Sequence, residues 1–534
     1  MDRLTTTPAA IDSPPSNLSS IRVSRAGLAV ALFALLYCAA QAATLTRTPL
    51  PWGDETFFAS MTDSLARQGT LHVLAELITY PTPLLLYGPV YFVLSLPFEW
   101  IFGVTPLMSR LPGMIFGLGL IALMFMMLRT RGVSQATSFL VCALAALDPA
   151  ISFSLHMGRM DTTALFFYLA SFLILLWRSE QTEGKARFLY PAASGLLAAL
   201  GLLTTPRPGY LVVATGLVLL ARVFRGRPAL ALSQLAVWSG TIIAIYLVWV
   251  FGAFGGIKEM LAYYGRFAGD YMGGSRGLLP RQVPLFVLVF GLLVALALLR
   301  PRQLGDELFR FSFLGAAGYF VLVKDVPYYS GTYSILMLPF IYLILGLALS
   351  KFGEETRRQR LVRASVLGIM LLVNGAVFVG RTLLVLAQWN ERSPRIAEQL
   401  VARIPAGSRV VGDFAFYFAV RSAGSDFQNF QSTINPRITT EVRAAYHKNV
   451  YRPDYLVTAV APDSEAMRTY QRELDLVKVA GPPEEVEQGP IGRFLVKAAA
   501  KLGFSAFGTD ASYRGYHGVV YGRRSAVSPA TGSR

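Results

Sequence analysis

The stretch RAGLAVALFALLYCAAQAATLTR, residues 25–47, decides the class of fold. It holds 21 uncharged residues between two arginines. An α-helix rises about 1.5 Å per residue, so this stretch is long enough to cross a hydrocarbon layer of about 30 Å. Similar uncharged runs follow at 111–128, 188–206, 228–257, 282–299 and 326–350. We therefore expect a polytopic α-helical membrane protein, with the first run retained as a helix rather than cleaved as a leader.

The composition supports the same class. Of the 534 residues, 54% are hydrophobic and only 15% are charged, which leaves too few polar side chains to cover a soluble protein of this size. The net charge of +17 would suggest nucleic acid binding in a soluble protein, but here Lys and Arg gather in short clusters between the apolar runs. This distribution indicates membrane lipid as a partner and no nucleic acid.

The basic clusters predict the orientation of the chain, because Lys and Arg favour the cytoplasmic side of a membrane. With every cluster in the cytoplasm, residues 1–25 lie inside and residues 26–387 form a transmembrane domain of about eleven helices. The predicted spans are 26–46, 106–128, 133–153, 162–177, 188–205, 209–221, 229–253, 283–299, 308–323, 331–349 and 364–386. The outer loop 47–105 is interrupted by proline and glycine, so we expect interfacial helices there rather than a crossing.

The composition changes after residue 388. Charges of both signs recur, and short β-like runs at 409–413, 454–460 and 493–496 alternate with helical stretches. We expect a small soluble α/β domain over residues 388–534. An odd number of spans places this domain on the same side as the outer loop, which is the periplasmic or external side of an inner membrane.

Two adjacent carboxylates, Asp54 and Glu55, follow the first apolar run in the segment PWGDET, residues 51–56. Asp54 could cap the helix suggested by the apolar residues after it, with its side chain accepting a hydrogen bond from an early backbone N–H. It could instead act as a general base at the membrane surface, with Glu55 in support. The segment alone leaves both interpretations open.

Further polar residues gather in the other loops predicted on the same side as Asp54. They are His156, Arg159, Asp161, Arg207, Arg266, Lys324, Tyr328 and Tyr329. Arginine binds two phosphate oxygens at once, and tyrosine adds a hydroxyl donor and a ring for sugar stacking. The loops therefore suit a substrate with an anionic leaving group such as phosphate. Each cation could instead reach lipid headgroups, and Arg159 could simply pair with Asp161 to fix its hairpin.

Several short motifs occur in a recognisable order. They are Asp54-Glu55, Tyr87-Gly88-Pro89-Val90-Tyr91, Ser109-Arg110-Leu111-Pro112, Arg159-Met160-Asp161, and Lys324 with Tyr328-Tyr329 before Pro339. In this order, and on this side of the membrane, they resemble the GT-C membrane glycosyltransferases, specifically the branch of protein O-mannosyltransferases and lipid A aminoarabinose transferases. The likeness covers about residues 26–350 and is strongest over 50–170.

The resemblance implies a glycosyltransferase of the cell envelope, with a sugar donor carried on polyprenyl phosphate and used on the non-cytoplasmic face. Asp54 would match the catalytic acidic residue of the family. It would deprotonate the acceptor hydroxyl while the sugar leaves the phosphate in an inverting displacement. Glu55 and Asp161 would then orient the acceptor or Arg159, and the acceptor would be a glycolipid, a polysaccharide or a protein.

One motif departs from the family pattern. Members often carry Lys-Pro-Pro or His-Pro-Pro where this chain has Tyr87-Gly88-Pro89. A cation expected near the donor phosphate is then missing, and another residue would have to replace it. The candidates for this replacement are Arg159, Arg207, Arg266 and Lys324.

Two other classes of function stay open at this point. A transporter or flippase of lipid-linked sugars would carry charges at mid-membrane and an internal repeat. A non-catalytic cell-envelope assembly protein would act through its C-terminal domain. No residues have clear metal-ligand spacing, and a divalent metal would fit only if the fold brought Asp54, Glu55 and His156 together.

Overall fold

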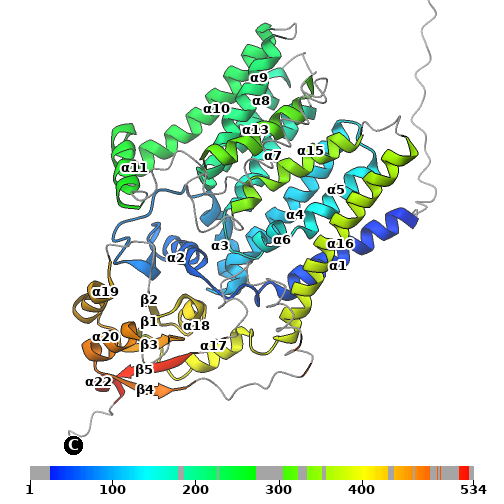
Figure 1. Ribbon diagram of the computed structural model, residues 1–534. Helices are drawn as coiled ribbons and strands as arrows, with labels where there is room; N and C mark the ends of the chain where they lie inside the picture. Colours follow the sequence, from blue (N-terminus) through cyan, green and yellow to red (C-terminus); the bar gives the residue numbers. More distant parts are fainter. Residues whose placement is uncertain are drawn as a thin grey trace, which may run out of the picture. The chain divides into compact units, whose positions relative to one another are not determined.

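The computed structural model describes residues 25–177, 186–224, 228–271, 305–322, 333–350, 356–430, 438–460, 464–481, 490, 494, 516 and 518–527. The chain forms two units, Met1–Ala43 and Thr44–Arg534. In the first, the described residues belong to the helix α1 (Arg25–Thr44), and Gln41 donates a hydrogen bond to Tyr37 one turn earlier. The second contains all other elements (Figure 1).

The second unit begins with three elements of the outer loop, which are α2 (Gly53–Gln68), the 3₁₀ turn η1 (Leu74–Glu76) and α3 (Val90–Phe102). The helical region then comprises α4 (Pro106–Thr130), α5 (Gln135–Leu147), α6 (Pro149–Ser154), α7 (Asp161–Trp177), α8 (Ala186–Thr204), η2 (Arg207–Gly209), α9 (Tyr210–Val223), α10 (Pro228–Phe254), α11 (Ile257–Tyr271), α13 (Glu307–Leu322), η4 (Ser334–Leu336), α15 (Leu338–Ser350) and α16 (Arg357–Ala387).

These helices confirm the predicted helical membrane fold. Within the part of the chain that the structure describes, four stretches are long and apolar enough to cross a membrane, by length and composition: Pro106–Thr130, Arg187–Thr204, Pro228–Phe254 and Ala364–Ala387. Shorter apolar helices occupy most of the other predicted spans. The predicted span 283–299 lies outside the described residues, and the total of about eleven spans stays a prediction.

One predicted span, 133–153, is two helices rather than one. α5 ends at Leu147, because Pro149 has no backbone N–H with which to continue the hydrogen bonds of that helix. Proline suits the first position of a helix, and Pro149 begins α6. Asp148 caps α6: its Oδ1 accepts hydrogen bonds from the backbone nitrogens of Ala150 and Ile151, at 2.9 and 3.2 Å. Its Oδ2 accepts one from Tyr342 at 2.9 Å. These partners give the carboxylate within this predicted span a structural role.

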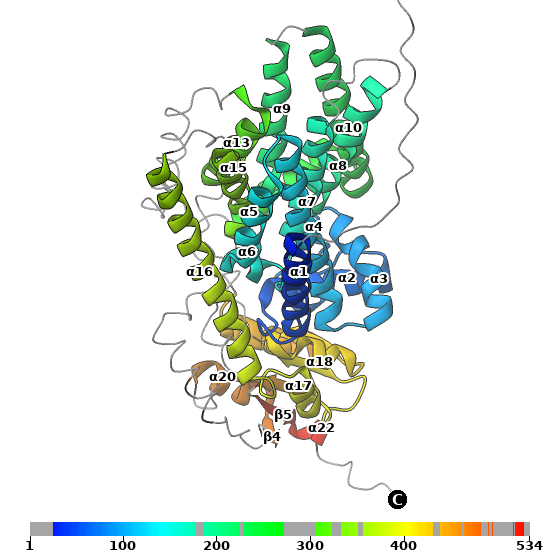
Figure 2. The same ribbon diagram turned by 90° about the vertical axis from the view of Figure 1, so that its right-hand side faces the viewer.

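The packing of the helical region rests on α4, α7, α8 and α10, which lie side by side (Figures 1 and 2). Glycine permits the closest of these contacts. A Cβ atom at Gly195 of α8 would stand 2.6 Å from the backbone oxygen of Trp238 in α10, a distance that no side chain tolerates. Elsewhere large rings fill the space between helices, as where Phe172 and Phe311 stack with 3.8 Å between their centroids.

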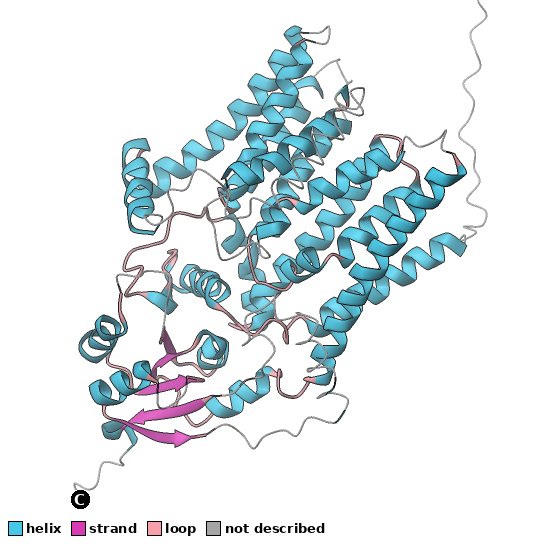
Figure 3. Ribbon diagram, in the orientation of Figure 1, coloured by secondary structure: helices cyan, strands magenta, loops and turns pink. Residues whose placement is uncertain are grey.

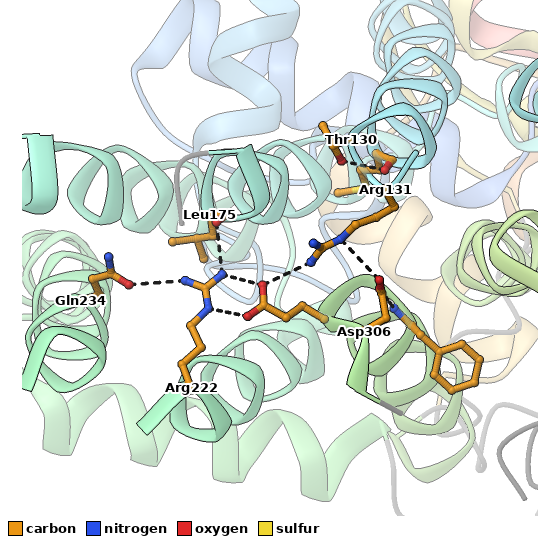
Figure 4. A network of polar contacts seen from close by, with 9 residues as sticks. Thr130, Arg131, Leu175, Arg222, Gln234 and Asp306 are labelled. Carbon is orange, nitrogen blue, oxygen red and sulfur yellow. Dashed lines mark hydrogen bonds and ion pairs between the residues drawn. The ribbon is translucent and has the colours of Figure 1, made fainter. Parts of the chain in front are cut away.

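Charged residues tie the helices together at the far end of α7 (Figure 4). Glu307, at the start of α13, accepts hydrogen bonds from Arg222 at 2.8 Å and from Arg131 at 3.3 Å. Arg222 also donates to the backbone oxygen of Leu175. Because Asp161 begins α7 and Leu175 lies fourteen residues later, this network is about 20 Å from Asp161 along the helix axis. The loops predicted as cytoplasmic therefore meet at one end of the helical region.

The C-terminal region is a small mixed sheet with helices (Figure 3). Its elements are α17 (Pro394–Val401), β1 (Arg409–Gly412), η5 (Phe414–Phe416), α18 (Tyr417–Ser422), β2 (Asp426–Asn429), α19 (Thr440–Tyr446), η6 (His447–Tyr451), β3 (Tyr455–Thr458), α20 (Glu465–Leu474), β4 (Leu476–Ala480), β5 (Val519–Arg523) and α22 (Arg524–Val527). The strand order is β2-β1-β3-β5-β4. β1 is parallel to β2 and β3, whereas β5 is antiparallel to β3 and β4.

This sheet confirms the predicted α/β character of the C-terminal region. β1 and β3 correspond to the predicted strands 409–413 and 454–460, while the third, 493–496, lies outside the described residues apart from Phe494. The core of the sheet uses apolar residues in register, such as Val410 opposite Phe427 and Tyr455. The boundary at residue 388 stays a prediction, since the sheet and the helices from Thr44 onward belong to one unit.

Candidate functional site

Asp54 lies in the first turn of α2 and does not cap it. The helix begins at Gly53, Trp52 occupies the N-cap position, and no side chain caps the helix there. The Asp54 side chain is 27% exposed and pairs with Nη1 of Arg159 through its Oδ2. A carboxylate in the first turn is favourable because the helix N-terminus carries a partial positive charge.

Arg159 lies in the short loop between α6 and α7, and it bridges the carboxylates of Asp54 and Asp161. Its Nε donates to Oδ2 of Asp161 at 2.7 Å, and its side chain is only 3% exposed. Burial alone would lower the pKa of Arg159, but the nearby carboxylates of Asp161 and Asp54 hold it well above the ordinary value. The expected pair between Arg159 and Asp161 is therefore present, and the same guanidinium also joins the loop to α2.

Arg207 brings a second cation to the same place. Its Nη2 donates to the Tyr87 hydroxyl at 2.7 Å, and its Nη1 stands 3.6 Å from Oδ1 of Asp161. Burial raises the pKa of Tyr87 to about 12. The backbones meet closely here, since a Cβ atom at Gly88 would lie 2.2 Å from the backbone oxygen of Leu203. Glycine after Tyr87 thus lets the outer loop approach the end of α8, where Arg207 follows.

Two aromatic side chains that the sequence analysis did not select surround these cations. The ring centroid of Tyr333 lies 4.6 Å from the guanidinium carbon of Arg159 and 5.1 Å from that of Arg207. Trp52 stands 5.6 Å from Arg159 on the same measure. An aromatic face attracts a cation at such distances. The available signal for Tyr333 was its place at the start of the predicted span 331–349, four residues after Tyr329.

Glu55 faces away from Asp54 and joins α2 to the start of α4. It makes a two-point ion pair with Arg110, at 2.5 and 2.7 Å, and both side chains are fully buried. Ser109 donates to the same carboxylate at 3.2 Å. Burial raises the pKa of Glu55, and the charge of Arg110 opposes that shift. Gly158 completes the contact: its φ is +59°, and a Cβ there would stand 2.1 Å from the Ser109 hydroxyl.

The other predicted residues do not join the Asp54 group within the described residues. His156 is buried, its Nδ1 lies 3.0 Å from the backbone oxygen of Thr48, and burial lowers its pKa. Arg266 is exposed on α11. Lys324, Tyr328 and Tyr329 fall outside the described residues. Among those residues, no three His, Cys, Asp or Glu side chains cluster closely enough to hold a metal ion.

The arrangement of elements is shared with solved structures of membrane proteins. ArnT from Cupriavidus metallidurans in the apo state is 15% identical, with 95% of this chain and 100% of that chain covered and a TM-score of 0.59. The same protein bound to undecaprenyl phosphate is 14% identical over the same shares, also with a TM-score of 0.59. This chain has the GT-C fold.

The GT-C fold is what the order of motifs in the sequence predicted, and that prediction is confirmed. An oligosaccharyltransferase from Archaeoglobus fulgidus is 13% identical, with 79% of this chain and 67% of that chain covered and a TM-score of 0.47. The sequence matches no protein-family model and no curated protein. At 14 to 15% identity, the likeness to ArnT speaks for the fold alone, so the activity must be argued from the residues.

Proposed function

We propose that this chain is an inverting glycosyltransferase that moves a sugar from a polyprenyl-phosphate donor to an acceptor hydroxyl. One observation carries the proposal. Nη2 of Arg159 is buried and has no hydrogen-bond acceptor among the described residues, and Nη1 of Arg207 is buried with only a long ion pair, 3.6 Å, to Oδ1 of Asp161. Buried donors of this kind are rare and costly. The oxygens of one phosphate would satisfy both, and arginine suits that geometry.

The undecaprenyl phosphate held by ArnT supports a lipid phosphate as the ligand here. In the proposed reaction, Asp54 takes the proton of the acceptor hydroxyl and the oxygen attacks the anomeric carbon of the sugar. The bond from that carbon to the phosphate oxygen breaks, and its electron pair stays on the polyprenyl phosphate. Arg159 and Arg207 neutralise the charge that develops on this leaving group.

The exposure of the two partners supports these separate roles. Asp54 is 27% exposed and Arg207 is 25% exposed, while Arg159 is buried between them. In the proposal, the acceptor approaches the Asp54 carboxylate and the phosphate approaches Arg207, with Arg159 next to both. The charge on Arg159 also fixes one oxygen of Asp54 and leaves the other for the proton. A general base placed in this way contributes about 10²- to 10⁴-fold to the rate.

The proposal includes the side of the membrane. The network around Glu307 contains the basic residues Arg131 and Arg222, which the positive-inside rule assigns to the cytoplasm. Asp161 begins the same helix, α7, at its other end. The site then faces the periplasm or the exterior of an inner membrane, together with the C-terminal sheet.

The first test compares wild type with Asp54→Asn in membranes, using radiolabelled sugars on a panel of polyprenyl phosphates. We expect transfer to fall by about 10²-fold or more, because the amide cannot accept the proton. Asp475→Asn is the matched control, since this carboxylate is 69% exposed in the C-terminal region. Equal transfer by wild type and Asp54→Asn would remove Asp54 as the base. Movement of the lipid-linked sugar across the membrane without transfer would favour a flippase.

A further inference from the structure

Side chains of the C-terminal region reach the outer loop that carries Asp54. We name these residues the clamp; they are Phe414, Arg421, Gln428 and Arg443. They come from four elements of that region: η5, α18, β2 and α19. The contacts are of three kinds: buried ion pairs, hydrogen bonds to backbone, and ring packing.

The first ion pair holds the middle of α2. Arg421 donates to Oδ2 of Asp63 at 2.8 Å, and the Asp63 side chain is fully buried. Asp63 also forms an ion pair with Arg67 one turn later, and Arg421 also donates to Asp426 at 2.8 Å. Because a buried charge is costly without its partner, these residues keep α2 and α18 together.

Two further contacts hold the segment after α2. The Gln428 amide donates to the backbone oxygen of Leu74 at 2.5 Å and accepts from the backbone nitrogen of Leu77 at 3.1 Å. Beside it, Arg443 pairs with Glu76 at 2.6 Å, and both side chains are buried. A backbone with both hydrogen-bonding groups engaged cannot move without losing them. Residues 74–77 are therefore fixed to the sheet region.

The last contact lies one turn from Asp54. The ring of Phe414 packs edge-on against Phe57, with 5.3 Å between centroids, and a Cβ atom at Gly53 would lie 3.3 Å from it. Asp63 follows Asp54 by nine residues, about two and a half turns of helix, so the two carboxylates point to opposite faces of α2. Arg421 therefore holds the face of α2 opposite to the one that Arg159 holds, and Phe414 packs beside the turn that carries Asp54.

We propose that the clamp positions Asp54, which makes the C-terminal region a part of the catalytic unit rather than a separate acceptor-binding module. The inference rests on the proposed glycosyl transfer. A general base works only within a narrow range of distance and direction from its substrate. Arg421, Gln428 and Arg443 are in this sense positioning residues, because they act through α2 and the segment after it.

The test uses the full-length protein in membranes and begins with Gln428→Ala, which removes both backbone contacts without leaving a buried charge. We expect kcat for sugar transfer to fall about tenfold or more. The KM for the donor should stay constant, because Arg159 and Arg207 belong to loops of the helical region. Amide hydrogen exchange over residues 70–80 should become faster. Arg443→Gln should behave in the same way, and Arg443→Lys should recover part of kcat.

Arg524→Gln is the matched control. It breaks an exposed ion pair, between Arg524 and Asp475, that also lies in the C-terminal region but is not among the contacts to residues 53–77. Wild-type kcat in both Gln428→Ala and Arg443→Gln would overturn the proposal, as would an increase in donor KM at constant kcat. If wild type transfers no sugar, the proposed function fails by itself. In that case unchanged exchange over residues 53–80 in Gln428→Ala would still overturn the clamp.

Discussion

Arg207 is the residue that we propose to replace the cation missing from the Tyr87-Gly88-Pro89 motif. Arg207→Gln removes this charge and the buried N–H groups proposed to meet the phosphate. Hydrogen bonds to charged groups contribute about 1.5 to 3 kcal/mol, so we expect the KM for the donor to rise about ten- to a hundredfold. Steady-state kinetics with a polyprenyl-phosphate sugar measures this. A larger effect from Arg266→Gln would mean that α11 holds the phosphate instead.

Glu55 and Asp54 are adjacent in sequence, yet we expect opposite consequences from their substitution. Glu55→Gln leaves Arg110 buried without its full charge partner, which costs about 3 to 5 kcal/mol of folding free energy. Asp54→Asn should cost far less, because Asp54 is partly exposed. Thermal unfolding of the two purified variants in the same detergent compares them. Equal losses of stability would contradict the separate roles.

Asp54, Arg159, Asp161 and Arg207 could be selected from the sequence, because charged residues are rare in this chain and these four stand in loops between apolar runs. The sequence could not separate Asp54 from Glu55, since neighbours in a helix point about 100° apart and only the packing says which one meets Arg110. Tyr333 was missed for a related reason. An aromatic residue at the start of an apolar run reads as part of the span, and its contact with two arginines exists only in three dimensions.

At the scale of elements, the length of the apolar runs predicted most helices of the helical region. It did not predict the break between α5 and α6 at Asp148. A proline inside an apolar run predicts a possible kink, but whether the preceding carboxylate becomes a cap depends on the partner that Tyr342 supplies from α15. Likewise β1 and β3 were predicted from β-branched residues. Their order in the sheet was not, because strand pairing depends on contacts between distant segments.

The C-terminal sheet region should lose stability in mild acid because of His447. Burial, and next the charge of Arg443, lowers the pKa of His447 to about 3. In the unfolded chain histidine takes up a proton near pH 6.5, so the unfolded state binds more protons between about pH 6.5 and 3. Stability is therefore complete above this window and falls as the pH drops through it, by roughly 3 to 5 kcal/mol in total.

Unfolding of the sheet region as a function of pH, followed by hydrogen exchange of residues 438–458, measures this loss. His447→Gln should flatten the dependence, because glutamine does not titrate. If the variant keeps the slope of wild type, His447 is not its source. The hydrogen bond between His447 and Tyr470, at 2.8 Å, would then have no role in the acid response.

At the scale of the molecule, the proposed topology predicts that the two ends of the helical region differ in accessibility. In a background with both natural cysteines replaced by alanine, we expect Val442→Cys to react with a membrane-impermeant maleimide from outside the cell membrane. Thr130 is the last residue of α4, at the end of the helical region predicted to be cytoplasmic. Thr130→Cys should therefore react only after permeabilisation. Both side chains are exposed, so burial does not limit the reaction. The reverse pattern would place the basic clusters outside.

The clamp also bears on how the protein is made. Asp63 and Arg421 are separated by 358 residues, and a ribosome that adds about 5 to 20 residues per second needs about 20 to 70 s to pass from one to the other. Under the proposed topology, the outer loop 47–105 has been translocated during that interval, but the residues that fix it have not yet been synthesised. Under the proposed clamp, a nascent chain is therefore inert toward lipid-linked sugars until its last quarter has been translated and folded.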